Sequence, residues 1–370
     1  MLVPRKAVRR VELNLSAVSM DPTLEPNTTA DFSYPTGDFY YPGTEWSPCD
    51  GELPQRGSGR PLAVLYCVLF VFGLLGNSLV ILVLVACRKL TSPTDVYLLN
   101  LALSDLLFVL SFPFQTHYRL DQWVFGTAMC KVVSGLYYVG FFSSMFFITV
   151  LSVDRYLAVV HAVYAMKVRT ARRGAALSLA VWLAAVAATS PLLVFYQVAS
   201  EDGVLQCYSF YDHQTVRWKI FTHLEMNILG LLLPFSILLF CYVGVLLQLK
   251  RCHNRSKARA VRLVLAVVVA SLLCWLPFNG VLFLTSLHSM HVLDGCATSQ
   301  RLVSATHVTE TISFTHCCVN PVIYAFMGEK FKKHLLEVFQ KTCSYICKGR
   351  RGPGEVRDVS SRSSSVDYVL

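Results

Sequence analysis

The chain has 370 residues, of which 54% are hydrophobic and only 15% are charged, and its mean hydropathy is +0.49. Soluble globular proteins carry about 25% charged residues, so the composition excludes a soluble enzyme, a disordered chain and a fibrous repeat. The net charge of +10 is spread along the chain and does not gather on one folded face, which argues against a nucleic-acid partner.

The N-terminal segment, residues 1–60, is polar, and it turns acidic after Met20, which is a plausible alternative start. Seven acidic residues and two arginines lie between Asp21 and Arg60. Sulfation of tyrosines in this setting would add further negative charge, although a solvated, disordered tail explains the composition equally well. The tyrosines concerned and a neighbouring acid are Tyr34, Asp38, Tyr40 and Tyr41.

A helix needs about 20 apolar residues to cross about 30 Å of hydrocarbon, and seven stretches of the chain meet this requirement. They are residues 61–87, 96–118, 127–153, 174–198, 220–249, 263–288 and 303–327. Lipid offers no partner to unpaired backbone groups, and the apolar runs do not alternate with polar residues as barrel strands do, so each span is predicted to be helical. We therefore expect an all-α membrane protein whose body, residues 61–327, is a bundle of seven transmembrane helices.

The C-terminal segment, residues 328–370, follows the last span. Residues 329–340 have an apolar and a basic face, which predicts a short amphipathic eighth helix lying along the membrane lipids. Cys343 and Cys347 come directly after it and are candidates for palmitoylation. The tail then becomes rich in serine, and its candidate phosphorylation sites are Ser360, Ser361, Ser363, Ser364 and Ser365.

The distribution of basic residues predicts the orientation. If the C-terminus is cytoplasmic, the inner segments hold 22 of the 33 Lys and Arg residues against 7 acids. The positive-inside rule then places the N-terminus outside, where Asn27 in Asn27-Thr28-Thr29 would be a glycosylation acceptor. We expect a multi-pass protein of the plasma membrane with an extracellular N-terminus.

Four cysteines lie on or near the oxidising outer face in this orientation. They are Cys49, Cys130, Cys207 and Cys296. Disulfides form readily in such a compartment, but four cysteines allow three pairings, and the residues alone do not choose among them.

Acidic residues inside the spans are candidates for function because burying a charge in a membrane is costly. Asp105 lies near the middle of the second span, where it is either a cation or proton site or a neutral structural acid. Glu310 lies one to two turns from the outer end of the seventh span. If its carboxylate has no partner in the protein, it can hold a cationic group of a ligand; the alternative is a packing role.

Six patterns occur in order on the predicted spans: Asn77, Leu103–Leu107, Asp154–Tyr156, Trp182, Cys274–Pro277 and Asn320–Tyr324. Together they resemble the rhodopsin-like G-protein-coupled receptors, and the resemblance covers residues 61 to about 340. The inner-loop sequence Asp154–Ala162 is similar to that of the chemokine receptors within this group. Trp123–Gly126, His316–Pro321 and the four outer cysteines resemble the same family.

The resemblance implies roles for particular residues. It pairs Cys130 with Cys207 and Cys49 with Cys296, and it places Trp275 at the floor of a ligand pocket. That pocket would be lined by Tyr66, Gln115, Tyr137, Tyr196 and Glu310, although many family members carry Trp where this chain has Gln115. The activation switch for the G protein would comprise Asp154, Arg155, Tyr242, Trp275, Asn320, Pro321 and Tyr324. A sodium pocket that favours the resting state would be formed by Asp105, Ser144 and Asn320.

The resemblance also implies partners. The acidic tail would grip a basic CC chemokine by electrostatic attraction, and the chemokine N-terminus would enter the pocket toward Glu310. Coupling to an inhibitory G protein would lead to calcium release and leukocyte chemotaxis, and arrestin would bind the phosphorylated tail. No cofactor is implied apart from the allosteric sodium ion. The main alternative is a scavenger that binds chemokine without signalling, which the intact Asp154-Arg155-Tyr156 motif disfavours.

Two other classes are less compatible with the sequence. A transporter would be expected to show an internal repeat between its halves, and none is visible. A membrane enzyme would need a metal-ligand pair or a nucleophile motif, and the histidines and serines form neither. We therefore predict that the chain is not an enzyme.

Overall fold

The computed structural model describes residues 59–327 apart from 88, 89, 91, 202, 212–215, 252–254 and 294. These residues belong to one compact unit of the chain. The predicted eighth helix, the acidic segment before residue 59 and the serine-rich tail lie outside the described residues.

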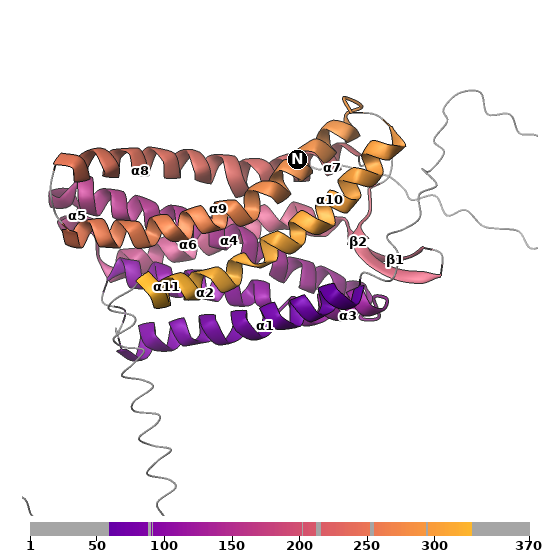
Figure 1. The fold of residues 1–370 in the computed structure, drawn as a ribbon, viewed down its shortest axis with the longest axis horizontal. Helices are drawn as coiled ribbons and strands as arrows, with labels where there is room; N and C mark the ends of the chain where they lie inside the picture. The colour runs from indigo at the N-terminus through magenta and orange to yellow at the C-terminus, as the bar shows by residue number, and fades with distance from the viewer. Residues whose placement is uncertain are drawn as a thin grey trace, which may run out of the picture. The chain divides into compact units, whose positions relative to one another are not determined.

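All seven predicted spans are helical. The helices are α1 (Gly59–Leu82), α2 (Pro93–Val109), α3 (Phe112–Leu120), α4 (Gly126–Val160), α5 (Ala162–Val168), α6 (Ala171–Val194), α7 (Val216–Asn227), α8 (Leu233–Arg251), α9 (Arg255–Ser289), α10 (Cys296–Phe314) and α11 (His316–Met327). Two π-helical stretches, η2 (Val83–Cys87) and η3 (Ile228–Leu232), continue α1 and join α7 to α8. Figure 1 shows the long helices running beside one another, with α4 in contact with α2, α6, α8 and α9.

The second predicted span is interrupted after Val109. Pro113 near the start of α3 has no N–H to donate to the carbonyl of Val109, so the regular helical ladder is broken there. Ser111 Oγ donates to the carbonyl oxygen of Phe108 at 2.7 Å and satisfies a group at this break. The short helix α3 can therefore take its own direction relative to α2.

The seventh predicted span is divided into α10 and α11 at Thr315. Six other helical stretches of the described chain are long and apolar enough to cross a membrane by themselves. The seventh segment differs because α10 contains polar residues such as His307, Thr309 and Glu310. It nevertheless packs within the bundle, where α10 contacts α9, and α11 contacts α1, α2 and α9.

A β-hairpin follows α6, in a region that the sequence analysis treated as the end of a span and a loop. Strand β1 (Tyr196–Glu201) pairs antiparallel with β2 (Val204–Ser209), and Val198 lies opposite Cys207. Gly203 at the turn has a φ of 75°, a conformation that favours glycine. The placement of Tyr196 within a span that continued to residue 198 is wrong, because α6 ends at Val194 and the chain then extends.

Two apolar clusters fill the bundle. One contains aromatic residues from several helices around Phe108, Tyr137, Phe141 and Trp275, and the other surrounds Tyr242 and Tyr324 toward the opposite end. Large apolar side chains such as Phe240 and Phe326 are exposed on the outside of the helices. A water-soluble protein would not display so many of them, whereas a bilayer solvates them.

The contact between α4 and α2 depends on Gly140. A Cβ atom at this position would lie 3.0 Å from the backbone nitrogen of Phe108 and 3.0 Å from the carbonyl oxygen of Ser104. Backbone atoms cannot rotate away as a side chain does, so the two helices would have to separate. Gly280 in α9 offers a comparison, because a Cβ there would meet no atom within 4 Å.

We expect Gly140→Ala to destabilise the bundle by about 1–3 kcal/mol, the usual cost of overpacking. Gly280→Ala is the matched control, and it should be neutral or stabilising because alanine is favoured over glycine in a helix by about 1 kcal/mol. Thermal unfolding of both purified variants in the same detergent measures the difference. Equal stabilities of the two variants would contradict the close contact.

Candidate functional site

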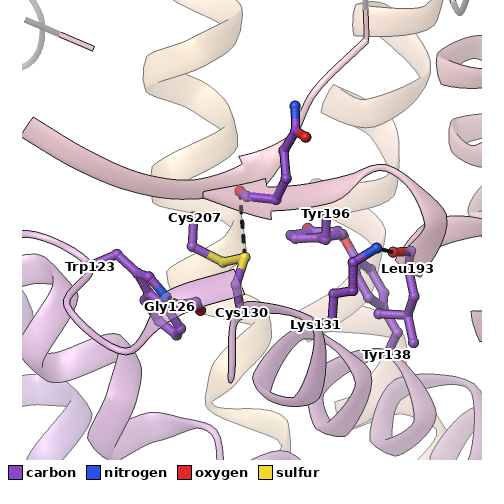
Figure 2. The surroundings of a disulfide bond; sticks show 9 residues. Trp123, Gly126, Cys130, Lys131, Tyr138, Leu193, Tyr196 and Cys207 are labelled. Atoms are coloured by element: carbon purple, nitrogen blue, oxygen red, sulfur yellow. Dashed lines mark hydrogen bonds between the residues drawn. A yellow bond between two sulfur atoms is a disulfide. The ribbon is translucent and has the colours of Figure 1, made fainter. Parts of the chain in front are cut away.

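A disulfide joins the hairpin to the first turns of α4. The sulfurs of Cys130 and Cys207 are bonded, and the Cα atoms are 5.7 Å apart. Figure 2 shows this bond beneath the hairpin, with Trp123 on one side. The backbone N–H of Trp123 donates to the carbonyl oxygen of Leu205 at 2.9 Å, and its indole N–H donates to that of Gly126 at 3.0 Å. The pairing of Cys130 with Cys207, which the family resemblance implied, is confirmed.

Side chains of α4 also hold the junction between α6 and the hairpin (Figure 2). Lys131 Nζ donates to the carbonyl oxygens of Leu193 at 2.8 Å and Val194 at 3.1 Å, which have no partner within the helix. The hydroxyls of Tyr138 and Tyr196 are 2.9 Å apart. Burial raises the pKa of the Tyr196 phenol well above its ordinary value, so the group stays neutral.

The second predicted disulfide involves Cys296, the first residue of α10. Cys296 is disulfide-bonded. Its predicted partner, Cys49, lies outside the described residues, so the pairing itself stays a prediction.

Aromatic rings from five helices form the interior below the hairpin. The ring of Tyr137 is 4.9 Å from that of Phe108 and 5.7 Å from that of Phe314, and the ring of Tyr66 is 5.2 Å from that of Phe314. Trp275 lies deeper and is fully buried, with its ring 6.0 Å from Phe108. Tyr66, Tyr137 and Trp275 thus belong to one continuous aromatic cluster.

The carboxylate of Glu310 is paired within the protein. Arg119 Nη2 donates to Glu310 Oε2 at 3.3 Å, and Arg119 Nη1 lies 3.3 Å from His307 Nδ1. The condition stated from the sequence, a carboxylate without a partner in the protein, is therefore not met in this structure. The side chains of Arg119 and Glu310 remain 22% and 26% exposed, so both are accessible to a ligand. Gln115, also on α3, is half-buried.

Asp105 lies in the middle of the bundle and is fully buried. Its Oδ2 accepts from Asn320 Nδ2 at 2.8 Å, and its Oδ1 accepts from Ser144 Oγ at 3.3 Å. His316 Nε2 is 3.7 Å from the same Oδ1. The three residues predicted for the sodium pocket are thus brought together, and the structure adds His316 to them.

The donor set at Asp105 fits a cation such as sodium. A carboxylate and a hydroxyl supply hard oxygen ligands, and the buried Oδ1 of Asn320 has no hydrogen-bond partner in the described part of the chain. His316 faces the same carboxylate oxygen and would compete with a bound cation for it.

Asp154 is the centre of an ionic cluster at the far end of α4. Arg155 Nη2 donates to Asp154 Oδ2 at 2.6 Å. Arg169 donates to the same carboxylate through Nε at 2.7 Å and Nη2 at 2.9 Å. Thr94 at the start of α2 donates to Asp154 Oδ2 at 2.8 Å and accepts from both arginines. Arg155 is therefore held by its neighbour on α4 and by α2.

Other members of the predicted switch lie in the packed interior of the bundle. Tyr242 and Tyr324 are both buried in the apolar cluster that also contains Val245 and Leu151. Pro321 has no N–H, so the carbonyl of Cys317 lacks its helical partner, and Asn77 Nδ2 donates to this carbonyl at 2.8 Å. A side chain of α1 thus satisfies the carbonyl that the proline leaves without its helical partner.

The sequence analysis missed four residues that complete these clusters. Arg119 and His307 flank Glu310, while Thr94 and Arg169 surround Asp154. The sequence indicated these residues only as charged or polar side chains near the ends of spans. Such residues are common in membrane helices, so their presence does not identify a partner.

The remaining candidate residues lie outside the described residues and stay predictions. They are Asn27, Tyr34, Asp38, Tyr40, Tyr41, Cys49, Cys343, Cys347, Ser360, Ser361, Ser363, Ser364 and Ser365.

Comparison with known proteins gives consistent results. Residues 76–324 match the family described as 7 transmembrane receptor (rhodopsin family). The chain is 70% identical to C-C chemokine receptor type 8 of Macaca mulatta and 70% identical to that of Homo sapiens, over 95% of this chain and 100% of each relative. It is 46% identical to C-C chemokine receptor type 4 of Homo sapiens over 88% of this chain and 89% of the relative.

These relatives are receptors and not enzymes, as predicted, and the family description supports counting α10 and α11 together as the seventh transmembrane segment. The chain belongs to the rhodopsin family of seven-transmembrane receptors and, within it, to the C-C chemokine receptors.

Proposed function

We propose that the chain is a plasma-membrane receptor for a basic CC chemokine and signals through an inhibitory G protein to calcium mobilisation and leukocyte chemotaxis. The observation that carries the proposal is the combination of an accessible carboxylate, Glu310, at the hairpin end with a restrained Arg155 at the opposite end. The similarity to C-C chemokine receptors supports the class of ligand. The hairpin end would face outward, the side predicted for the N-terminus.

In the proposed mechanism, the acidic segment captures the chemokine and the chemokine N-terminus enters the bundle. Its ammonium group would exchange with Arg119 as the partner of Glu310. The aromatic cluster below transmits the displacement, because Trp275 contacts Phe108 above and its ring lies 4.9 Å from that of His316 beside Asp105. A ligand acts on such a two-state bundle only through its different affinities for the two states.

The output requires Arg155 to leave Asp154. In the structure Arg155 shares that carboxylate with Arg169, which supports its assignment to a resting state. Release would make Arg155 available to a G protein, and Tyr242, Tyr324, Asn320 and Pro321 lie on the helices that would have to rearrange. The phosphorylated serines of the tail would bind arrestin, and palmitoylated Cys343 and Cys347 would attach the tail to the membrane.

No cofactor is needed for this activity. A sodium ion held by Asp105, Ser144 and the Asn320 side-chain oxygen would neutralise the buried carboxylate and favour the resting bundle. In the structure Asn320 Nδ2 and His316 Nε2 already face this carboxylate, so they would share it with a bound cation.

The second candidate is a scavenging receptor that binds chemokine without signalling. The ionic cluster at Asp154 favours a signalling receptor, because its contacts restrain Arg155 without removing it from the end of the bundle.

The test is calcium flux in cells expressing the full chain, with a panel of CC chemokines and with or without pertussis toxin. A toxin-sensitive response supports the proposal, whereas binding without a response favours the scavenger. The absence of both binding and response would contradict a chemokine ligand.

We predict that Glu310→Gln lowers agonist potency about tenfold, since a hydrogen bond to a charged group contributes about 1.5–3 kcal/mol. Arg119→Gln should not lower potency, because it frees Glu310 for the ligand. Concentration–response curves for calcium flux at matched surface expression measure both effects. Asp121→Asn is the control, because this exposed acid has no contact with Glu310 among the described residues. If both Glu310→Gln and Arg119→Gln reduce potency equally, the pair is structural and Glu310 does not bind the ligand.

We also predict that Asp154→Asn raises signalling in the absence of ligand. The change removes the charge that holds Arg155, so the resting state loses a hydrogen bond between charged groups and the active population rises about tenfold. Arg169→Gln leaves the Arg155–Asp154 pair in place and should cause a smaller rise. Inhibition of cyclic AMP formation without agonist is the readout. Unchanged basal signalling at normal surface expression would show that this pair does not restrain the receptor.

A further inference from the structure

A groove lies beside the ionic cluster and shares Asp154 and Arg169 with it. It has a volume of about 370 Å³ and is lined by residues of α2, α4, α6 and the short connection between α5 and α6. This volume is within the range of about 300–1,000 Å³ that is usual for small-molecule sites. Most of its wall is apolar, formed by Tyr97, Val150, Val153, Leu157, Val168 and Leu177.

The rim of the groove carries positive charge. Arg169 and Arg173 line it together with Asp154. The carboxylate of Asp154 already accepts from Arg155 and Arg169, so these four side chains have a net charge of +2. Lys167 and Arg172, both exposed, are close by in the sequence but do not line the groove.

Of the two arginines that line the groove, Arg173 has the weaker contacts within the protein. Its guanidinium makes only long contacts, from Nη1 to the carbonyl oxygens of Lys167 at 3.4 Å and Val168 at 3.3 Å. Within the described part of the chain, no carboxylate lies within ion-pair distance of it. The side chain is exposed, so an external anion can reach it.

The charged and apolar parts of the groove follow one another along the membrane normal. Arg173 is in the first turn of α6, a helix that crosses the membrane, and is therefore at the level where head groups meet hydrocarbon. Leu177 is four residues deeper, on the same face of the helix, about 6 Å further into the bilayer. It is 43% exposed although it lines the groove, so this part of the groove is open to lipid chains.

We propose that this groove binds one anionic phospholipid, whose phosphate contacts Arg173 and Arg169 and whose acyl chain lies along Val153 and Leu177. Charge complementarity distinguishes this occupant from a zwitterionic lipid, and the apolar wall distinguishes it from a free phosphate ion. Each arginine near a membrane surface contributes about 1 kcal/mol to the attraction of anionic lipid. The proposal requires only that the bundle crosses a membrane, so it stands or falls independently of the chemokine ligand.

The site has a consequence for the ionic cluster. Arg169 contacts Asp154 and also lines the groove, so a lipid phosphate and the Asp154 carboxylate would share this arginine. The occupied groove would therefore be coupled to the residue that holds Arg155. Arg173 does not contact Asp154 in the structure, which makes it the better position for a test of binding alone.

The test is native mass spectrometry of the purified full chain in detergent with added dioleoyl phosphatidylserine or dioleoyl phosphatidylcholine. We expect one phosphatidylserine molecule to be retained in preference to phosphatidylcholine, and Arg173→Gln to weaken its retention about fivefold. Arg172→Gln is the matched control, because this neighbouring arginine is exposed but does not line the groove. Both positions are at the surface, and thermal unfolding in lipid-free detergent verifies that the variants fold equally.

Three outcomes would overturn the proposal. Equal loss of phosphatidylserine from Arg172→Gln and Arg173→Gln would indicate general attraction to a basic surface. Displacement of the lipid by soluble glycerol phosphate at equal concentration would indicate a free phosphate site. Preferential retention of cholesteryl hemisuccinate, unaffected by Arg173→Gln, would indicate a sterol groove. Loss of phosphatidylserine from Val153→Phe, which fills the apolar part, would support the assigned position of the acyl chain.

Discussion

Hydrocarbon provides no hydrogen-bond partner, and this constraint governs the whole described bundle. Wherever a proline interrupts a helix, the carbonyl that it frees must be satisfied by the protein. Asn77 donates to the carbonyl of Cys317, four residues before Pro321, and Ser190 donates to that of Ala187, four residues before Pro191. The first of these contacts also joins α1 to α11. A local defect in one helix thus becomes a specific contact between two helices.

The same constraint applies to the acidic side chains. Glu310, Asp105 and Asp154 lie at successive depths, and each is paired with donors from another part of the chain. A buried carboxylate cannot be left without a partner, so a change of state must exchange one partner for another. Such exchanges connect distinct arrangements of the helices, which is the property that a switch requires. The three acids therefore mark the positions where the bundle can exchange one set of side-chain partners for another.

The fold was largely predictable because the apolar runs are long and uninterrupted, and the helix ends differ from the predictions by a few residues. The hairpin was not predictable from periodicity, since a span signal continued through Tyr196 and short paired strands carry little pattern of their own. Individual residues whose charge is energetically costly to bury in a membrane, such as Asp105, were identified from the sequence. Their partners were not, because Arg119 lies 191 positions from Glu310 and only the fold brings the two together. The Cys130–Cys207 bond depended on family resemblance, since composition left three pairings open.

Helix α4 differs from three other helices of the bundle. It runs without proline from Gly126 to Val160, whereas α6, α9 and α11 each contain one. Cys130, which anchors the hairpin, and Arg155 lie on this one rod, separated by 25 residues or about 37 Å. A rod of this kind transmits rotation and translation from end to end but cannot bend to absorb them. Bends between the two ends of the bundle are therefore expected at the prolines of α6, α9 and α11, and not within α4.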